Sequence, residues 1–176
     1  MKILLISITV GALTEELGIS MIAATLKKKY DVQIVSLNIN NSTENVHKYV
    51  ADFMPEIIGI NIYNVTREKV YEVSRQIKSI NSDIFVFAGG VEAFCNPKRI
   101  LQEEECIDFV ISGEGEQTTI ELIKAIGDNM SLDDIDGLSY RSNGKIYKIY
   151  INKPRKLLNQ INACQCQIEQ FCRIVK

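Results

Sequence analysis

Residues 84–90 read IFVFAGG, an apolar run without polar alternation that ends in two glycines. Similar apolar blocks recur at residues 3–6, 32–35, 57–60 and 109–111. Strands buried on both faces have this pattern, because helices cover both sides of a parallel sheet. The sequence therefore predicts five buried strands.

Helical patterns lie between these blocks. The clearest two place apolar or small residues at the helix period: Val70, Val73, Ile77 and Ile80 in one, and Thr119, Leu122, Ile123 and Ile126 in the other. Strands that alternate with helices imply a parallel sheet with right-handed crossovers and helices on both faces. We predict an α/β, doubly wound, flavodoxin-like five-stranded parallel sheet with strand order 2-1-3-4-5.

The pattern changes from Asp136 onward. Two short strand-like segments flank Asn143-Gly144, a pair that readily takes the positive φ angles of a type I′ hairpin turn. After residue 156 the chain is rich in Gln, Asn and Cys. We therefore predict three parts: a Rossmann-like domain over residues 1–135, an appended β-hairpin and linker over 136–156, and a tail over 157–176, either a short helix or frayed.

Composition narrows the class of protein. The 176 residues suffice for one sizeable core, and a net charge of −2 gives no reason to expect a nucleic-acid partner. Five cysteines, an odd number, suit a reducing compartment. The apolar start leads into Thr14-Glu15-Glu16 without a cleavage pattern, and no transmembrane run follows. We expect a cytoplasmic protein without membrane or nucleic-acid partners.

Candidate ligand-binding residues follow the predicted strands. In an open parallel sheet, ligands bind beyond the carboxyl ends of the strands, where loop amides and helix N-termini converge. The segments in those places are rich in glycine, small hydroxyls and amides, and poor in nucleophiles and bases, so we expect a binding surface without catalytic or metal-ligating residues. The candidates are Ser7, Thr9, Gly11, Asn61, Tyr63, Asn64, Gly89, Gly90, Val91, Gly113, Glu114, Gly115 and Glu116.

Each of these features has a plainer explanation when taken singly. Gly89-Gly90 could form an ordinary tight turn, and residues 113–116 could simply start a helix. We expect His47 on the second helix, away from any ligand, and Cys95 and Cys106 as buried free thiols. Cys164, Cys166 and Cys172 lack the paired C-x-x-C loops of zinc ribbons.

An ordered set of motifs resembles the cobalamin-binding domain of cobalamin-dependent radical SAM enzymes, which include anaerobic magnesium-protoporphyrin monomethyl ester cyclases and methyltransferases. The resemblance covers about residues 1–156. The motifs are LGI at 17–19, GINIYN at 59–64, AGGVEA at 88–93, DFVISGEGEQT at 108–118 and DGLSYRSNGKI at 136–146. The most specific part of the resemblance is the fourth motif followed by the fifth.

The resemblance implies a bound cobalamin, with its corrin over the strand ends and its nucleotide tail between the loops after strands one, four and five. Classical carriers have D-x-H-x-x-G after strand one, and Ile6 and Ile8 stand here in the Asp and His positions. We therefore expect a His-off complex. The lower cobalt face would be open or taken by water, or by Ser7, Thr9 or Asn61.

The catalytic half of that family binds an iron-sulfur cluster through C-x-x-x-C-x-x-C, a spacing that these 176 residues do not contain. An iron-sulfur cluster and S-adenosylmethionine would therefore belong to a full-length or partner chain. The resemblance suggests a front domain truncated, split or excised before the catalytic barrel, and not catalytic alone.

Other functions of the same architecture fit less well. A phosphoacceptor receiver needs acids and a lysine in the places that Ser7, Asn61 and Ser112 occupy. A Rossmann dinucleotide site is less suitable too, because no G-x-G-x-x-G follows strand one. A flavodoxin-like flavin-binding module stays open, since residues 7–14 form a thin phosphate loop. A degenerate domain that serves as an interaction module also stays open.

Overall fold

The computed structural model describes residues 1–11 and 17–149. Helices and strands alternate from the N-terminus to α6, and a hairpin follows. The elements are β1 (Lys2–Thr9), α1 (Leu17–Leu26), β2 (Asp31–Asn38), α2 (Ser42–Phe53), β3 (Ile57–Asn61), the 3-10 helix η1 (Asn64–Thr66), α3 (Arg67–Ile80), β4 (Phe85–Gly89), α4 (Val91–Cys95), α5 (Pro97–Glu103), β5 (Phe109–Ile111), α6 (Gly115–Asp128), β6 (Leu138–Ser142) and β7 (Lys145–Lys148).

The strands form one sheet in the order β2-β1-β3-β4-β5-β6-β7 across the described residues. The first five strands run parallel, which confirms the predicted order 2-1-3-4-5. The hairpin is also confirmed, with φ of 49° at Asn143 and 73° at Gly144, as a type I′ turn requires. Because β6 pairs antiparallel with β5, the hairpin extends the sheet and does not stand apart from it.

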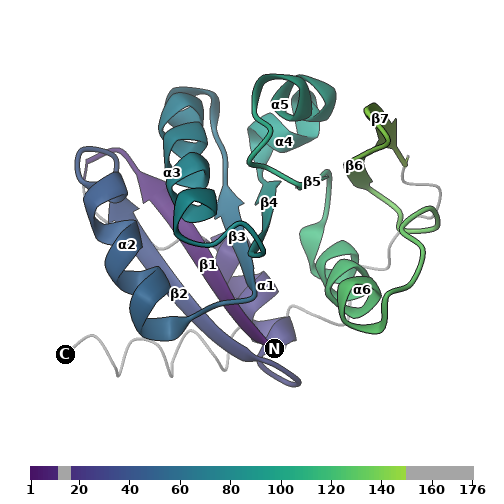
Figure 1. The fold of residues 1–176 in the computed structure, drawn as a ribbon, viewed down its shortest axis with the longest axis horizontal. Coiled ribbons are helices and arrows are strands. Elements are labelled where there is room, and N and C mark those ends of the chain that lie inside the picture. Colours follow the sequence, from purple (N-terminus) through teal and green to yellow (C-terminus); the bar gives the residue numbers. More distant parts are fainter. Residues whose placement is uncertain (12–16, 150–176) are drawn as a thin grey trace.

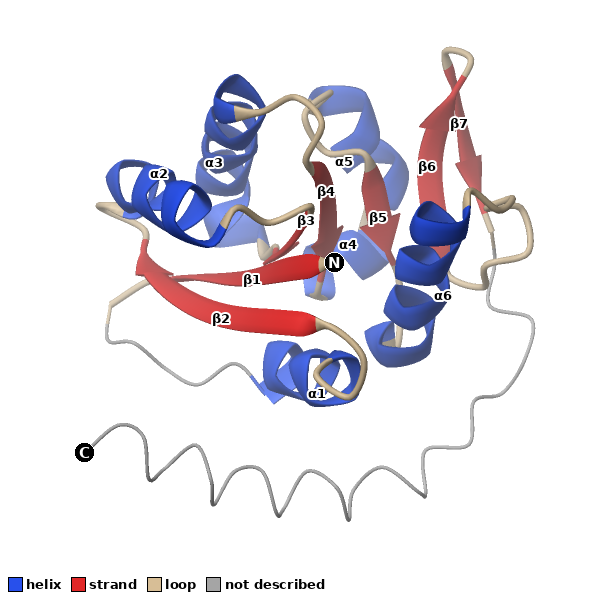
Figure 2. Cartoon of the chain, turned by 60° about the horizontal axis from the view of Figure 1, so that its bottom comes forward, coloured by secondary structure: helices blue, strands red, loops and turns tan. Residues whose placement is uncertain are grey.

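Two apolar cores lie on the two faces of the sheet, because successive side chains of a strand point to opposite faces. In β1, Leu4, Ile6 and Ile8 pack against α2 and α3, whereas Ile3 and Leu5 pack against α1 and α6. Figure 2 shows the strands in red, with α1 and α6 on one side and α2, α3 and α5 on the other. One face is therefore covered by more helices than the other (Figure 1).

The connection from β4 to β5 differs from a single helix. The five-residue α4 ends at Cys95, and α5 begins at Pro97. Proline has no amide hydrogen to donate, so it is favoured at the first turn of a new helix and cannot continue the preceding one. Since β4 ends at Gly89 and α4 begins at Val91, this short helix lies directly at the carboxyl end of β4.

Some expectations about side-chain burial were wrong. Cys95 is exposed at the end of α4 and Cys106 is half-buried in the turn before β5, so neither packs as a core residue. Burial raises the pKa of the Cys106 thiol. Ile80, at the last turn of α3, is exposed although it continues the apolar stripe of that helix.

Two further expectations concern the C-terminal tail and the absence of a membrane-spanning segment. The predicted tail over residues 157–176, with its three cysteines, lies outside the described residues. Among residues 1–11 and 17–149, no helix has the length and apolar character needed to cross a membrane.

Candidate functional site

A pocket of about 230 Å³ opens at the carboxyl end of the sheet, between α1 and the start of α6. Strands β1, β3, β4 and β5 supply its floor, the two helices supply its walls, and the loops after β3, β4 and β5 surround its mouth. The lining residues are Leu5, Gly18, Ile19, Ile22, Gly59, Ile60, Asn61, Tyr63, Phe87, Gly89, Gly90, Ile111, Gly113, Glu114, Gly115 and Glu116.

The floor consists of two rows of residues that run across adjacent strands. In the lower row, Leu5 pairs with Gly59, and Gly59 pairs with Phe87. In the upper row, nearer the mouth, Asn61 pairs with Gly89. A Cβ added to Gly89 would meet no atom within 4 Å, so the space above this glycine is open.

The two helical walls come together at one point. A Cβ on Gly115 would lie 3.1 Å from the Cδ1 atom of Ile22, so the glycine lets the start of α6 approach α1 closely. Ile19 of α1 is part of the apolar core beneath the walls. The pocket thus has an apolar base, and its polar groups lie nearer the mouth.

Asn61 organises the carboxyl ends of β1 and β3. Its Oδ1 accepts a hydrogen bond from the Ile8 amide at 3.1 Å, and its Nδ2 donates to the Ser7 hydroxyl at 3.4 Å. Ser7 is fully buried, and the Thr9 hydroxyl donates to the Leu37 carbonyl of β2 at 3.5 Å. The side chains of Ser7 and Thr9 therefore bond within the sheet.

The loops after β3 and β4 are tied together by their backbones. The Ile62 amide donates to the Gly89 carbonyl at 2.8 Å, and the Glu92 amide donates to the Ile62 carbonyl at 3.2 Å. Gly90 has a φ of 106°, and a Cβ there would lie 3.2 Å from the Ile62 carbonyl oxygen. Only glycine adopts this turn without strain.

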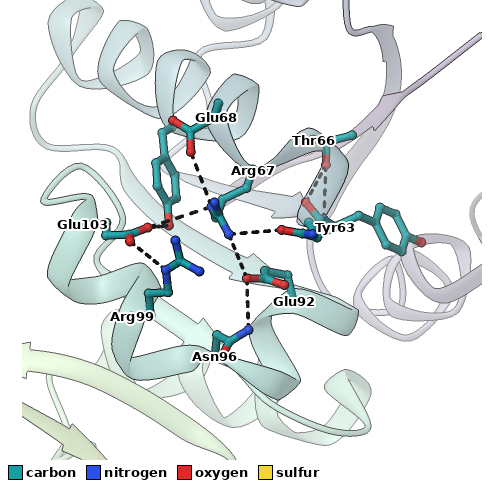
Figure 3. Close-up of polar contacts among 10 residues, drawn as sticks. Tyr63, Thr66, Arg67, Glu68, Glu92, Asn96, Arg99 and Glu103 are labelled. Atoms are coloured by element: carbon teal, nitrogen blue, oxygen red, sulfur yellow. Dashed lines mark hydrogen bonds and ion pairs between the residues drawn. The ribbon is translucent and has the colours of Figure 1, made fainter.

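A network of polar side chains supports the same two loops from the other face (Figure 3). The Arg67 guanidinium at the start of α3 lies 3.3 Å from the largely buried Glu92 carboxylate of α4, and it also donates to Asn64 Oδ1 at 3.2 Å. Asn96 donates to the same Glu92 oxygen at 3.1 Å. The network fixes α4 against the loop after β3.

The outer part of this network joins α3 to α5. The Glu103 carboxylate accepts hydrogen bonds from Arg99 at 2.7 Å and from the Tyr71 hydroxyl at 3.1 Å. The hydrogen bond from Arg99 holds the pKa of the Glu103 carboxyl below its ordinary value. Burial, followed by the contact with Glu103, raises the pKa of Tyr71.

The structure brings together most of the residues that the sequence predicted. Eight of the thirteen candidates line the pocket: Asn61, Tyr63, Gly89, Gly90, Gly113, Glu114, Gly115 and Glu116. The other five lie around it. Gly11 and Val91 are exposed at the carboxyl edge, Asn64 bonds Arg67, and Ser7 and Thr9 bond within the sheet.

Sequence reasoning missed two groups of residues. The first is the apolar floor and walls, notably Leu5, Gly59, Phe87 and Ile22. The second is a set of exposed apolar residues at the carboxyl ends of the strands: Val10, Val65 and Phe94. A glycine inside an apolar strand is a signal for close approach, so Gly59 could have been found from the sequence.

Glycines, apolar side chains and a few polar side chains line the pocket. His47 is exposed on α2, which covers the opposite face of the sheet. Within residues 1–11 and 17–149, no group of three or more His, Cys, Asp or Glu side chains could hold a metal ion. The pocket lining has two carboxylates, Glu114 and Glu116, and no Ser, Cys, Lys or His among its residues.

Comparison with known proteins agrees with this geometry. Residues 3–123 match the family model described as the B12 binding domain. An uncharacterized methyltransferase of Pyrococcus horikoshii is 33% identical over 154 residues, which are 87% of this chain and 33% of that protein. The anaerobic magnesium-protoporphyrin IX monomethyl ester cyclase of Rubrivivax gelatinosus is 26% identical over 136 residues, which are 74% of this chain and 24% of the cyclase.

Solved structures share the fold. The radical S-adenosylmethionine methyltransferase TsrM of Kitasatospora setae, with cobalamin and a [4Fe-4S] cluster bound, superposes with a TM-score of 0.77 at 17% identity, over 89% of this chain and 30% of that one. The cobalamin-dependent S-adenosylmethionine radical enzyme OxsB, with aqua-cobalamin and S-adenosylmethionine bound, superposes with a TM-score of 0.71 at 19% identity. The match covers 94% of this chain and 25% of that one.

The chain spans a third or less of the length of these relatives. Its match to the family model runs from β1 into α6 and includes every strand that contributes to the pocket floor. The chain belongs to the B12-binding domain family and is related to cobalamin-dependent radical SAM methyltransferases and cyclases.

Proposed function

We propose that the pocket between α1 and α6 holds the nucleotide tail of cobalamin, with the corrin ring lying on the carboxyl edge of the sheet. The observation that carries this proposal is the open, apolar-floored pocket above Gly89, at the carboxyl ends of the strands, where open parallel sheets bind ligands. Drug-sized ligands need pockets of about 300–1,000 Å³. A pocket of about 230 Å³ suits an aromatic base better than a whole corrin.

The carboxyl edge suits the corrin. Val10, Val65, Val91 and Phe94 expose apolar surface in the loop after β1, in η1 and in α4, where a broad ring could cover it. The Arg67–Glu92 ion pair and the Gly90 turn keep two of these segments at a fixed separation. In this arrangement the chain binds and orients the cofactor and excludes water from one face of the ring.

Cobalamin, when bound, supplies methyl-group or radical chemistry through its cobalt. The chain's own contribution to the cobalt is small in this proposal. Ile6 and Ile8 are buried and Ser7 bonds Asn61, so β1 offers no imidazole and no free hydroxyl at the site. His47 lies on the helix layer of the other face. The complex is therefore His-off, with the lower face open or taken by water or by a side-chain oxygen of the edge.

The proposal extends to the chain's place in a larger system. Residues 1–135 form the cofactor-binding unit, and residues 136–156 form the hairpin and linker. The iron-sulfur cluster and S-adenosylmethionine are bound by a radical SAM segment or partner chain, since the 176 residues contain no C-x-x-x-C-x-x-C. The 176-residue chain by itself is not catalytic, and it acts in the cytoplasm, in anaerobic metabolism.

The test is incubation of the purified chain with hydroxocobalamin or flavin mononucleotide, followed by gel filtration and an absorption spectrum. We expect corrin bands with the protein and no flavin bands. A yellow flavin spectrum without corrin would support a flavodoxin-like flavin site, and neither spectrum would support an interaction module.

Electron paramagnetic resonance of the reduced cob(II)alamin sample tests the coordination. One axial nitrogen ligand splits each cobalt line into three. The proposed complex has no axial nitrogen, so we expect each cobalt line to stay single. Triplets that vanish in His47→Ala would contradict the His-off proposal.

A further inference from the structure

Phe87 closes the bottom of the pocket. Its ring lies directly on Gly59 of the neighbouring strand, since a Cβ on Gly59 would fall 2.2 Å from Phe87 Cζ and 2.8 Å from Leu5 Cδ2. Phe87 and Gly59 both line the pocket. The ring therefore covers the lower row of the floor and leaves the upper row, with its open Gly89, accessible from the mouth.

The depth of the pocket follows from this arrangement. Phe87 and Gly89 are two residues apart on β4, a separation of about 6–7 Å along a strand. With the ring in place, a ligand that enters over Gly89 meets Phe87 before it reaches Gly59. Without the ring, the pocket would extend by one further row of the sheet.

The bottom of the pocket also has a definite chemistry. Leu5, Phe87 and Ile111 are apolar, and the polar side chains of the adjoining row, Ser7 and Asn61, bond each other. A polar atom carried to the bottom of this pocket would lack a partner there among the described side chains. An unpaired buried polar group lowers affinity by roughly tenfold to a hundredfold.

We propose that Phe87 selects the base of the corrinoid, favouring the methyl-substituted edge of dimethylbenzimidazole over the amine-bearing edge of adenine. This inference rests on the proposed function, because it assumes that the nucleotide tail enters the pocket. Phe87 acts here by contact with the base and makes no contact with the corrin.

The experiment measures the dissociation constants of three corrinoids with the full 176-residue chain by spectroscopic titration. The first is cobalamin, the second is its analogue with adenine as the base, and the third is cobinamide, which has no nucleotide. We expect the wild-type chain to prefer cobalamin over the adenine analogue by roughly tenfold to a hundredfold. We expect Phe87→Leu to weaken cobalamin binding by roughly tenfold and to leave cobinamide binding unchanged.

The matched control is Phe109→Leu. Phe109 pairs with Phe87 across β4 and β5 and is also buried, but it does not line the pocket. Its loss should destabilise the fold comparably and leave the preference for cobalamin intact. Gly59→Ala supplies an independent test, because its Cβ would force the Phe87 ring out of its place at the bottom of the pocket and should weaken cobalamin binding but not cobinamide binding.

Each outcome decides a different claim. Equal wild-type affinity for cobalamin and the adenine analogue, or an unchanged ratio in Phe87→Leu, would overturn the selection by Phe87 while cobalamin binding stands. Cobinamide bound as tightly as cobalamin would overturn the placement of the tail, and with it the role of Phe87. Failure of all three corrinoids to bind would remove the proposed function itself.

Discussion

The two faces of one sheet differ in what they can do, although the same strands make both. In β3, Ile58 belongs to the core under α2 and α3, whereas Gly59 and Asn61 line the pocket under α1 and α6. In β4, Val86 and Ala88 face the first core, and Phe87 and Gly89 face the pocket. Alternation along a strand therefore separates a face that only packs, the stability face, from the face of the proposed site, the binding face, and small residues on one side of the strand create the pocket.

The largest expected effect comes from filling the pocket. Gly89→Leu places a side chain in open space, and the backbone at Gly89 needs no positive φ, so we expect an intact fold. Cobalamin affinity should fall by about a hundredfold or more, because the side chain occupies the volume that the tail requires. Isothermal titration with hydroxocobalamin measures the loss, and circular dichroism checks the fold.

Gly127→Leu is the matched control for this variant. It makes the same exchange on α6 but at the amino edge, where a Cβ would approach only the Met1 Cε atom at 3.3 Å. The affinity of Gly127→Leu for cobalamin should equal that of the wild type. Equal affinity in Gly89→Leu and wild type would show that the pocket is not the site. Gly90→Leu is a poorer test, because the φ of 106° strains any side chain at that position.

The second prediction contrasts core truncations on the two faces. Ile77→Ala removes a fully buried side chain of α3 from the stability face and should lower the free energy of unfolding by about 2–4 kcal/mol. Ile22→Ala trims a half-buried wall of the pocket and should cost less stability. Cobalamin affinity of the folded protein should fall only in Ile22→Ala. Urea unfolding measures the stability of both variants, and ligand titration measures their cobalamin affinity. The contrast would be contradicted if Ile77→Ala weakened cobalamin binding as much as Ile22→Ala does.

The third and smallest effect is a pH dependence confined to the stability face. The pKa of the Glu103 carboxyl is lowered in the folded chain, so its ion pair stabilises the fold above the unfolded pKa of about 4.3 and ceases to do so as the pH falls through the folded pKa. Glu103→Gln should therefore have a lower Tm than wild type at pH 6, and the gap should narrow as the pH falls below the unfolded pKa.

Thermal melts across this range check the prediction, with the exposed Glu105→Gln as the control. A gap between wild type and Glu103→Gln that persists or widens in acid would count against the ion pair. Cobalamin affinity at pH 6 should be the same in all three proteins, because Glu103 does not line the pocket.

Much of the fold could be predicted from the sequence, because unalternated apolar blocks and Asn143-Gly144 are local signals that each specify one element. The mouth of the site could also be predicted, since glycines and amides after strands converge by the rule for open parallel sheets. The floor could not. Phe87 looks like any core residue until its pairing with Gly59 is known, and that pairing depends on the register between β3 and β4.

Burial was harder to predict than topology. Cys95 and Cys106 are apolar enough for a core, but each falls in a short element or turn that the sheet does not cover. The side-chain oxygen of Asn64, a predicted ligand-binding amide, accepts a hydrogen bond from Arg67 three residues on. Such local competition between side chains depends on geometry that sequence spacing does not contain.

Hydrogen–deuterium exchange with and without hydroxocobalamin tests the central claim most directly, because it compares the two faces in one sample. The account predicts slower exchange on binding in α1 and in residues 113–119 at the start of α6, together with the loops after β3 and β4. Exchange in the body of α2 and in the C-terminal half of α3 should not change. Protection confined to α2 and α3, with none at α1 or α6, would contradict the assignment of the binding face.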